Sequence, residues 1–303
     1  MTQFNLVAEN ENTTVVSDYN SAIGRDKAYQ SEAELEKDFI KLLGEQKYEY
    51  VAINSEKDLI ANLRLQLEIL NDFKFTEKEW DSFFKTKIAN PNSSIPEKTA
   101  IIQEDYIQLL NREDGSVKNI YLLDKTNIHN NRLQVINQYE IEGSSAVIPG
   151  QTRNNRYDIT ILVNGLPMVH VELKRRGVDI QEAFNQINRY SRESFWSGSG
   201  LFEYVQIFVI SNGTYTKYYS NSTRVSHIKE FGNTTSGSKK RTSNSYEFTS
   251  WWADANNKPI IDLMDFGKTF FSKHSLLNIL IRYCVFTSDR TLLVMRPYQI
   301  VAT

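Results

Sequence analysis

The sequence predicts an α/β fold in which a mixed β-sheet is flanked by helices. Residues 31–46 and 57–72 carry apolar side chains at helical spacing. Between about residue 101 and residue 220, short apolar or alternating segments recur, separated by turn residues, as is typical of strands. One further helical pattern directly follows a pair of these strands. Helices and strands interleaved in this way favour a sheet covered by helices.

Bulk properties limit the class of protein. The chain has 303 residues with 40% hydrophobic residues, enough to bury a core. Its net charge is −2, so no overall basic field indicates nucleic-acid binding. A single cysteine excludes an internal disulfide framework. The polar start and the lack of a long apolar run lead us to expect a cytoplasmic protein without membrane contact.

The first half of the chain is predicted to be mainly helical. Ser31 and Glu34 form a capping box that opens the helix at 31–46, and Thr76 and Glu79 open another. On the first helix, Glu36 borders the apolar stripe. It is either a carboxylate at the edge of a solvated face or part of a site.

Strands are expected next, followed by helix near the end. The predicted segments are a hairpin from 101–110 and 119–124, a strand at 133–141, a buried strand at 204–211, an edge strand at 214–220, a helix over 260–283 and a strand then a turn over 292–303. The polar stretch 221–248 contains the basic triplet 239–241. That stretch is either a loop or a DNA contact.

Most of the candidate site residues lie between Tyr157 and Tyr190. The first of two predicted strands there carries Asp158, and the second carries Glu172 and Lys174. Strand side chains alternate between faces, so a plain two-residue turn at Asn164 and Gly165 would put the two carboxylates on opposite faces. Their convergence therefore predicts a bulged or odd-membered turn.

Two converging carboxylates and a lysine suit a hard cation. Mg²⁺ prefers oxygen ligands and is usually held by one or two carboxylates together with substrate phosphate. The alternative is a solvent-exposed strand, which often carries charged residues of the same types. The following helix adds support, because Asp179 and Glu182 form a capping pair and Gln186 and Tyr190 lie one turn apart beside its apolar stripe. The local basic excess fits phosphate contact or a solvated helix face, and comprises Lys174, Arg175, Arg176, Arg189 and Arg192.

Other chemistries find little support. The four histidines have no paired zinc spacing, and no Walker A, G-x-S-x-G or G-x-G-x-x-G motif occurs. His170 could be a metal ligand, but a role in packing or hydrogen bonding is the commoner one for such a residue.

These residues resemble a known family. Asp158, the triplet Glu172-Leu173-Lys174 and the pair Gln186 and Tyr190 resemble the D…ExK and QxxxY pattern of RecB-like nuclease domains. Longer segments are similar to the N-terminal endonuclease region of the R subunit of type I restriction–modification enzymes, especially the IC branch. These are RYDITILVNGLPMVHVELKRRG, EAFNQINRYS, FVISNGT and LLVMRPYQ.

The resemblance implies a restriction-endonuclease-like PD-(D/E)xK core that cuts double-stranded DNA with Mg²⁺. Asp158 and Glu172 would hold the metal with the Leu173 carbonyl, and Lys174 would serve the attacking water. Gln186 and Tyr190 would set the site and approach the DNA. Glu36 would match an acidic residue on the first helix of such nucleases, with Glu34 as a near alternative.

The family's R subunit continues into an ATP-driven motor. The resemblance implies that Arg296, Tyr298 and Gln299 lie near the nucleotide. No phosphate-binding loop occurs, so we expect a piece of a longer protein that does not itself hydrolyse ATP. The expected parts are an arm (1–30), an endonuclease domain (31–258) and a linker helix with the start of the first motor lobe (259–303). Expected partners are double-stranded DNA and the methyltransferase and specificity subunits.

Two alternatives remain at this point. A non-catalytic, nuclease-like docking module would fit the near-neutral charge, although the intact acidic pair and its lysine argue against it. A stand-alone repair nuclease is disfavoured by the motor-like end of the sequence.

Overall fold

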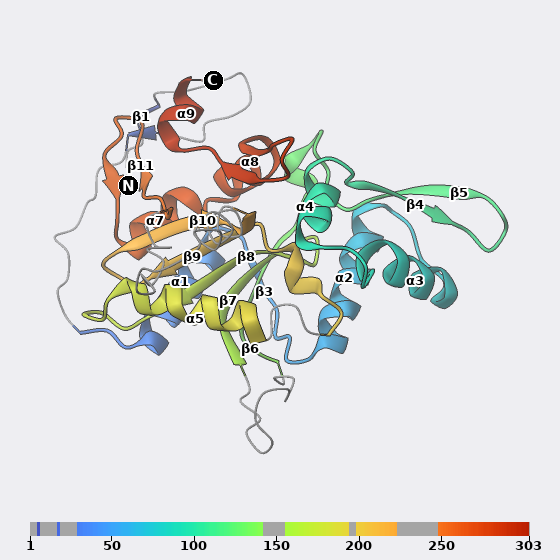
Figure 1. Cartoon of the computed structure of the whole chain (residues 1–303), viewed down its shortest axis with the longest axis horizontal. Coiled ribbons are helices and arrows are strands. Elements are labelled where there is room, and N and C mark those ends of the chain that lie inside the picture. Colours follow the sequence, from blue (N-terminus) through green and yellow to red (C-terminus); the bar gives the residue numbers. More distant parts are fainter. Residues whose placement is uncertain are drawn as a thin grey trace, which may run out of the picture. The chain divides into compact units, whose positions relative to one another are not determined.

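The computed structural model describes residues 29–141, 155–193, 198–222 and 248–302, together with two short strands near the start of the chain (Figure 1). Its helices are α1 (Glu32–Glu45), α2 (Glu56–Leu70), α3 (Glu77–Phe83), the π-helix η1 (Phe84–Ile88), α4 (Ile95–Gln103), the 3-10 helix η2 (Ile128–Asn130), α5 (Ile180–Glu193), the 3-10 helix η3 (Leu201–Tyr204), α7 (Leu263–Phe270), α8 (Lys273–Arg282) and α9 (Pro297–Ala302). None of these described helices has the length and apolar character needed to cross a membrane.

The strands confirm a mixed α/β fold. They are β1 (Asn5–Leu6), β2 (Ser17–Asp18), β3 (Glu49–Tyr50), β4 (Ile107–Asn111), β5 (Val117–Tyr121), β6 (Leu133–Ile141), β7 (Asn155–Val163), β8 (Leu166–Leu173), β9 (Ile207–Ser211), β10 (Thr216–Ser220), β11 (Trp252–Ala253), β12 (Pro259–Ile260), β13 (Cys284–Phe286) and β14 (Leu292–Val294). Six of them form one sheet in the order β10-β9-β8-β7-β6-β3. The sheet is mixed because β3 runs parallel to β6 whereas β6 pairs antiparallel with β7.

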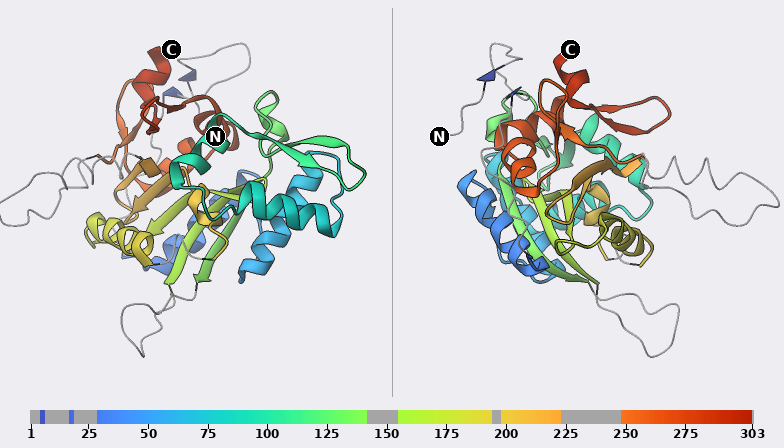
Figure 2. Two further views of the ribbon diagram at one scale, coloured as in Figure 1. Left: turned by 45° about the vertical axis from the view of Figure 1, so that its right-hand side comes forward. Right: turned by 90° about the vertical axis from the view of Figure 1, so that its left-hand side faces the viewer.

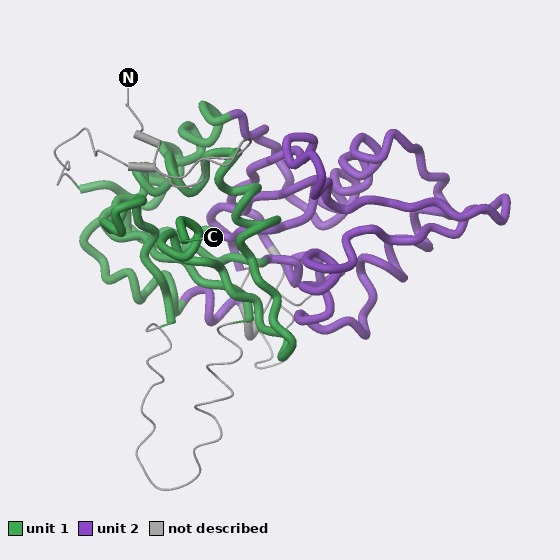
Figure 3. The backbone as a smooth tube through the Cα atoms, turned by 90° about the horizontal axis from the view of Figure 1, so that it is seen from above, with its two compact units in different colours: residues 1–46, 171–185, 206–303 green, residues 47–170, 186–205 purple. Residues whose placement is uncertain are grey.

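The chain divides into two compact units (Figure 3). Unit 1 comprises residues 1–46, 171–185 and 206–303, and unit 2 comprises residues 47–170 and 186–205. In unit 1 an aromatic cluster links β10 to α7, with Tyr218 and Phe270 at 5.2 Å and Trp252 and Phe270 at 5.1 Å between ring centroids. In unit 2, β4 and β5 form a hairpin that reaches past α3 (Figure 2). The predicted domain boundaries stay a prediction.

Several predicted elements are confirmed by their local chemistry. Both capping boxes form, at Ser31 with Glu34 and at Thr76 with Glu79, so α1 and α3 begin where the sequence indicates. β10 lies at the edge of the sheet, as its alternating pattern predicts. Most of the 221–248 stretch, including its basic triplet, lies outside the described residues.

Three predictions about elements are wrong. The segment 101–110 is not a strand throughout, because α4 extends to Gln103 and is opened by a capping box at Ser94. The region 260–283 forms two helices, since Ser272 caps α8 and breaks the pattern. The end of the chain forms the helix α9 in place of a turn, and β13 pairs with β14.

Candidate active site

The turn between β7 and β8 is a plain two-residue turn, so the predicted bulged turn is wrong. β7 ends at Val163 and β8 begins at Leu166. Asn164 and Gly165 have φ angles of 50° and 83°. Two consecutive positive φ values define the type I′ turn, whose twist matches that of the strands it joins, and Asn-Gly is its preferred sequence.

Hydrogen bonds within unit 2 fix this turn. The Asn164 main-chain amide donates to the Arg132 carbonyl at 3.0 Å, and its side-chain oxygen accepts from the Arg132 amide at 2.9 Å. Its side-chain amide donates to the Leu122 carbonyl at 3.1 Å and to Asn131 Oδ1 at 2.7 Å. The buried asparagine therefore has its polar atoms satisfied, and the tip of the hairpin is anchored to the neighbouring loop.

Beyond the turn, the strand pair departs from simple alternation. A register set by the turn alone would place Thr160 opposite Val169. Instead, Thr160 Oγ1 and His170 Nδ1 lie 3.3 Å apart. The strand pair therefore does not keep the register that the two-residue turn sets.

His170 is the buried centre of this part of unit 2. Its ring lies 5.5 Å from that of Tyr157 and 6.4 Å from that of Tyr190. Burial lowers its pKa to about 4, although the charge of Asp158 acts in the opposite direction. His170 is therefore neutral at pH 7, and its contacts are those of packing and hydrogen bonding. Asp158 itself is buried on β7, with 9% of its surface exposed.

In unit 1, the Lys174 side chain contacts two of the predicted metal ligands at the end of β8. Its ammonium donates to the Leu173 carbonyl at 3.0 Å and lies 3.8 Å from Glu172 Oε1. The Glu172 side chain is fully buried, and Lys174 is 12% exposed. The main-chain amide of Lys174 donates to the Ser211 carbonyl of β9 at 2.8 Å, which fixes the backbone. The Lys174 ammonium thus lies close to one carboxylate, that of Glu172, and one main-chain carbonyl, that of Leu173.

Helix α1 supplies a carboxylate that sequence reasoning missed. Glu32 lies 3.5 Å from the Lys174 ammonium and is 46% exposed. Glu36, the predicted acidic residue, is buried one turn further along the same helix. The near alternative, Glu34, is engaged in the capping box, where it accepts from both the amide and the hydroxyl of Ser31. The four-residue spacing between Glu32 and Glu36 is the signal that could have identified Glu32.

Gln186 and Tyr190 contact each other within unit 2, as their spacing predicts. The Gln186 side-chain amide donates to the Tyr190 hydroxyl, which in turn donates to the Arg156 carbonyl at 2.7 Å. Tyr190 is almost fully buried, and its ring lies 4.9 Å from that of Tyr157. The hydroxyl is thereby engaged with the main chain of β7, two residues before Asp158.

The predicted basic residues divide into engaged and exposed ones. Arg176 is held by Gln30 at 2.6 Å, by Thr214 at 3.1 Å and by Asp262 at 3.5 Å. Arg175 and Arg189 are exposed, and the Arg192 side chain lies outside the described residues. The local basic excess available to a ligand is therefore smaller than the sequence indicates.

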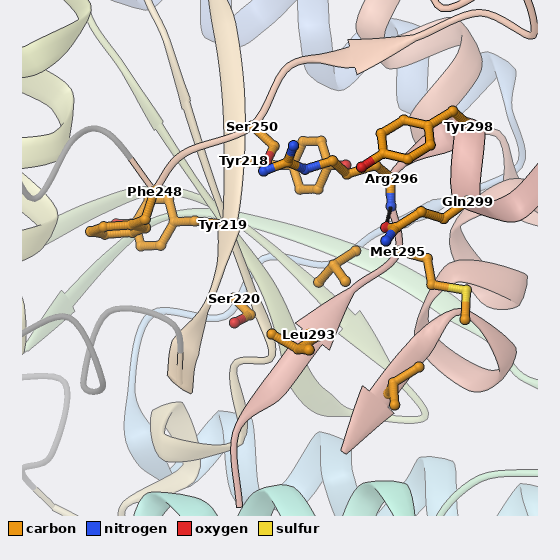
Figure 4. Close-up of a pocket in the computed structure, with 12 residues that line it drawn as sticks. Tyr218, Tyr219, Ser220, Phe248, Ser250, Leu293, Met295, Arg296, Tyr298 and Gln299 are labelled. Carbon is orange, nitrogen blue, oxygen red and sulfur yellow. Dashed lines mark hydrogen bonds between the residues drawn. The ribbon is translucent and has the colours of Figure 1, made fainter. Parts of the chain in front are cut away.

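A pocket in unit 1 contains the three residues expected near a nucleotide. It has a volume of about 490 Å³ and lies between β10 and the segment from β14 to α9 (Figure 4). Arg296, Tyr298 and Gln299 line it, together with Tyr218. Gln299 Oε1 accepts from the Arg296 amide at 2.8 Å. The buried Tyr218 hydroxyl has no hydrogen-bond partner within the described part of the chain.

The described residues contain no group of three or more His, Cys, Asp and Glu side chains arranged to hold a metal ion. The predicted donor set is of a different kind, because it combines two carboxylates with a main-chain carbonyl. The Glu172 and Leu173 oxygens around the Lys174 ammonium have the hard-oxygen chemistry that Mg²⁺ prefers.

Comparison with known proteins gives a consistent result. The model of a family described as "Type I restriction enzyme R protein N terminus" matches residues 29–227. The Escherichia coli "Type I restriction enzyme EcoprrI endonuclease subunit" is 48% identical over 298 residues, which cover 98% of this chain and 88% of the relative.

More distant relatives match nearly as much of the chain. The "Type I restriction enzyme SauMSSORF170P endonuclease subunit" of Staphylococcus aureus (strain MSSA476) is 36% identical over 281 residues, 91% of this chain and 27% of the relative. The "Type I restriction enzyme SsaAORF53P endonuclease subunit" of Staphylococcus saprophyticus is 35% identical over 278 residues, 90% of this chain and 26% of the relative. The chain thus spans about a quarter of the length of these two relatives.

Proposed function

Because the chain belongs to the family of type I restriction enzyme R protein N termini, we propose that it is the endonuclease part of such an enzyme and cuts double-stranded DNA with Mg²⁺. The observation that carries this proposal is the Lys174 ammonium, which contacts both the Glu172 carboxylate and the Leu173 carbonyl. The relatives' names, which print "endonuclease subunit", support the same activity.

The proposed metal ligands are Asp158, Glu172 and the Leu173 carbonyl. The charge of Asp158 acts on His170, and His170 precedes Glu172 by two residues on β8. Side chains two apart on a strand share a face. When bound, Mg²⁺ supplies charge that polarises the scissile phosphate and acidifies a water molecule.

The chain's own residues then have distinct roles in this proposal. Lys174 orients the attacking water or offsets charge that builds up on the phosphate. Gln186 and Tyr190 hold the main chain of β7 at Arg156 and so support the site next to Asp158. Glu32 and Glu36 place further negative charge on α1, and Glu32 shares Lys174 with Glu172.

The test uses the whole restriction enzyme with its partner subunits. Asp158→Ala, Glu172→Ala and Lys174→Ala should each abolish DNA cutting while ATP hydrolysis and translocation continue. Lys37→Ala, which removes an exposed charge on α1, should leave cutting unchanged. Full cutting by the Asp158→Ala enzyme would overturn this assignment of the site.

We further propose that the unit 1 pocket holds the base of an adenine nucleotide. Arg296, Tyr298 and Gln299 line it, and the Tyr218 hydroxyl offers a buried polar atom without a partner in the described residues. Such an atom is costly to leave unsatisfied, so a ligand that hydrogen-bonds to it gains affinity. Calorimetric titration with ADP should show binding that Gln299→Ala weakens. Lys258→Ala is the control, because Lys258 is not among the residues that line the pocket.

In the whole enzyme, cutting would follow ATP-driven translocation by motor lobes, in an assembly with methyltransferase and specificity subunits. The family membership of the chain supports this assignment. A tethered-DNA assay would test it. Cleavage should require ATP and a DNA length sufficient for translocation, and efficient cutting without ATP would contradict it.

A further inference from the structure

Two exposed aromatic side chains lie together in unit 1, at the β10 edge of the main sheet. Tyr215 lies in the turn between β9 and β10 and is 46% exposed, and Trp251 directly precedes β11 and is 36% exposed. Their ring centroids are 6.1 Å apart, with an angle of 63° between the ring planes. Single exposed rings are ordinary, whereas rings that gather at one place on a surface indicate a contact site.

The backbone places both rings on one face of the sheet. Tyr218 and Ser250 exchange main-chain hydrogen bonds of 3.0 and 2.8 Å, so the segment that carries Ser250 runs antiparallel along β10. This register sets Trp251 opposite Lys217, and Tyr215 is two residues from Lys217. Cross-strand partners share a face, and so do residues two apart on one strand. The two rings and the Lys217 side chain therefore project together.

Lys217 adds a positive charge to this aromatic pair. Its ammonium lies 4.7 Å from the centroid of the Trp251 ring and donates to Thr249 Oγ1 at 3.1 Å. Partial burial lowers the pKa of the Lys217 ammonium, because its charged form loses part of its hydration there. An anion that binds close to this charge replaces part of the lost hydration. A phosphate group is therefore a suitable neighbour for Lys217.

Hydrogen bonds join this surface to the backbone around Lys174. The Lys174 amide donates to the Ser211 carbonyl at 2.8 Å. The next residue, Asn212, is buried, and its side-chain amide donates to the Val178 carbonyl at 2.7 Å. Its side-chain oxygen accepts from the Tyr215 amide at 2.8 Å, and its own amide donates to the Tyr215 carbonyl at 3.1 Å. Asn212 thus holds the turn that carries Tyr215 against the segment that follows Lys174.

We propose that Tyr215, Trp251 and Lys217 form a stacking site for single-stranded DNA. The rings stack on an unpaired base, and the Lys217 ammonium binds an adjacent phosphate. A base within an intact duplex has both faces covered by its neighbours, so an exposed ring stacks only on a base that has left the duplex. Aromatic rings for the bases and cations for the backbone are the usual chemistry of single-strand binding. This inference rests on the proposed nuclease function of the chain.

The test compares two DNA probes, a plain duplex and the same duplex with a single-stranded tail. Binding of each labelled probe to the chain is followed by fluorescence anisotropy, with Ca²⁺ in place of Mg²⁺ to prevent cutting. Tyr215→Ala and Trp251→Ala should weaken binding of the tailed probe about 5-fold to 100-fold, the range for loss of one stacked base, and leave the plain duplex unaffected. Tyr215→Phe keeps the ring and should match the unmodified protein.

Tyr121→Ala is the matched control for loss of an exposed ring. Tyr121 lies on β5 in unit 2 and is 41% exposed, close to the value for Tyr215. Its removal should leave the binding of both probes unchanged. Because Tyr215 is also exposed, Tyr215→Ala should stay folded, and it carries the test if Trp251→Ala does not fold.

The salt dependence of binding identifies the role of Lys217. Lys217→Met should reduce the slope of log affinity against log salt concentration by about 0.7, the share of one phosphate contact on a single strand. Tyr215→Ala should leave this slope unchanged, because it removes no charge. Lys217→Arg keeps the charge and should keep the slope. Lys41→Met, at an exposed position of α1, controls for the loss of a positive charge.

The outcomes separate this inference from the nuclease proposal. Normal binding of the tailed probe by folded Tyr215→Ala and Trp251→Ala would overturn the stacking site, and equal losses for both probes would overturn its preference for single strands. In either case the nuclease proposal stands if Lys174→Ala abolishes cutting by the whole enzyme. Full cutting by Lys174→Ala would overturn the nuclease proposal itself. Weaker binding of the tailed probe alone, with Lys174→Ala inactive, supports both.

Discussion

The Tyr190 hydroxyl donates to the main-chain carbonyl of Arg156 at 2.7 Å, so a side chain of α5 directly holds the backbone of β7. Tyr190→Phe removes this bond and also the acceptor that Gln186 uses. We expect a loss of about 1 kcal/mol in the free energy of unfolding, measured by urea titration. We also expect a fall in cleavage rate with little change in DNA affinity, because the Tyr190 side chain is buried and its hydroxyl holds the backbone of β7 two residues before Asp158.

Tyr204→Phe is a matched control for that experiment. The Tyr204 hydroxyl also donates to a main-chain carbonyl, that of Ile88, at 2.9 Å. Its removal should cost similar stability while the cleavage rate of the folded protein stays unchanged. Equal losses of cleavage in both variants would indicate that the effect of Tyr190→Phe is general destabilisation.

Gly165→Ala should strongly destabilise the chain. Gly165 has a φ of 83°, and an added Cβ would lie 2.6 Å from the Cα of Leu63 on α2. Gly115 has the same φ, but an added Cβ meets nothing within 4 Å. Gly115→Ala should therefore cost only the backbone strain, about 1 kcal/mol, and Gly165→Ala clearly more. Denaturant unfolding of the two variants measures the difference, and equal losses would contradict the close approach of α2.

Lys174→Met should separate metal binding from cleavage. The Lys174 ammonium lies against the Leu173 carbonyl and Glu172, two of the proposed ligands, so a cation must compete with it there. The variant should bind Mn²⁺ at least as tightly as the unmodified protein but cut at least about 100-fold more slowly. Arg175→Met, at the exposed neighbouring position, should retain Mn²⁺ affinity. Much weaker Mn²⁺ binding by Lys174→Met would show that the lysine supports the ligands.

Glu68 should make the stability of unit 2 depend on pH. Burial raises its pKa, but hydrogen bonds from Lys74, Arg64 and the Phe75 amide outweigh this, and the net pKa lies below 4.5. A carboxylate whose pKa is lowered by folding stabilises the protein above its unfolded pKa, and this is lost as the pH falls through its folded pKa. Glu68→Gln should cost about 2 kcal/mol at pH 7.

The pH dependence distinguishes Glu68 from an ordinary surface acid. The stability difference between Glu68→Gln and the unmodified protein should shrink as the pH falls from about 4.5 toward the folded pKa. Urea titrations at a series of pH values measure it. Glu104→Gln, at an exposed position, should cost little at any pH. A Glu68→Gln penalty that persists unchanged at low pH would indicate that the contribution is packing.

Elements were predicted well from the sequence where the residues that define them lie close together along the chain. The capping boxes at Ser31 and Thr76 depend on residues three apart, so the sequence alone locates the helix starts. The capping box at Ser94 also depends on residues three apart, but the apolar run that follows it favoured a strand. Ser272 was harder to interpret, because a serine within an apolar helical pattern is either a tolerated residue or a cap.

The site was less predictable because it depends on tertiary contacts. Strand alternation tied the predicted convergence of Asp158 and Glu172 to a bulged turn, but the turn has two residues. Asn164 tolerates a positive φ, so the turn stays regular, whereas nothing in the residue type of Gln138 indicates its positive φ. Glu32 was missed because a helix face alone does not show which of its carboxylates meets Lys174.

The anchored turn at Asn164 also determines where the chain can accept extra residues. Its side chain and main chain bond to Leu122, Asn131 and Arg132, and α2 lies against Gly165. A peptide tag inserted there would have to break these bonds and displace a helix. The open turn at Gly115 faces no such barrier, so a tag or fluorophore-bearing loop belongs in the β4–β5 hairpin.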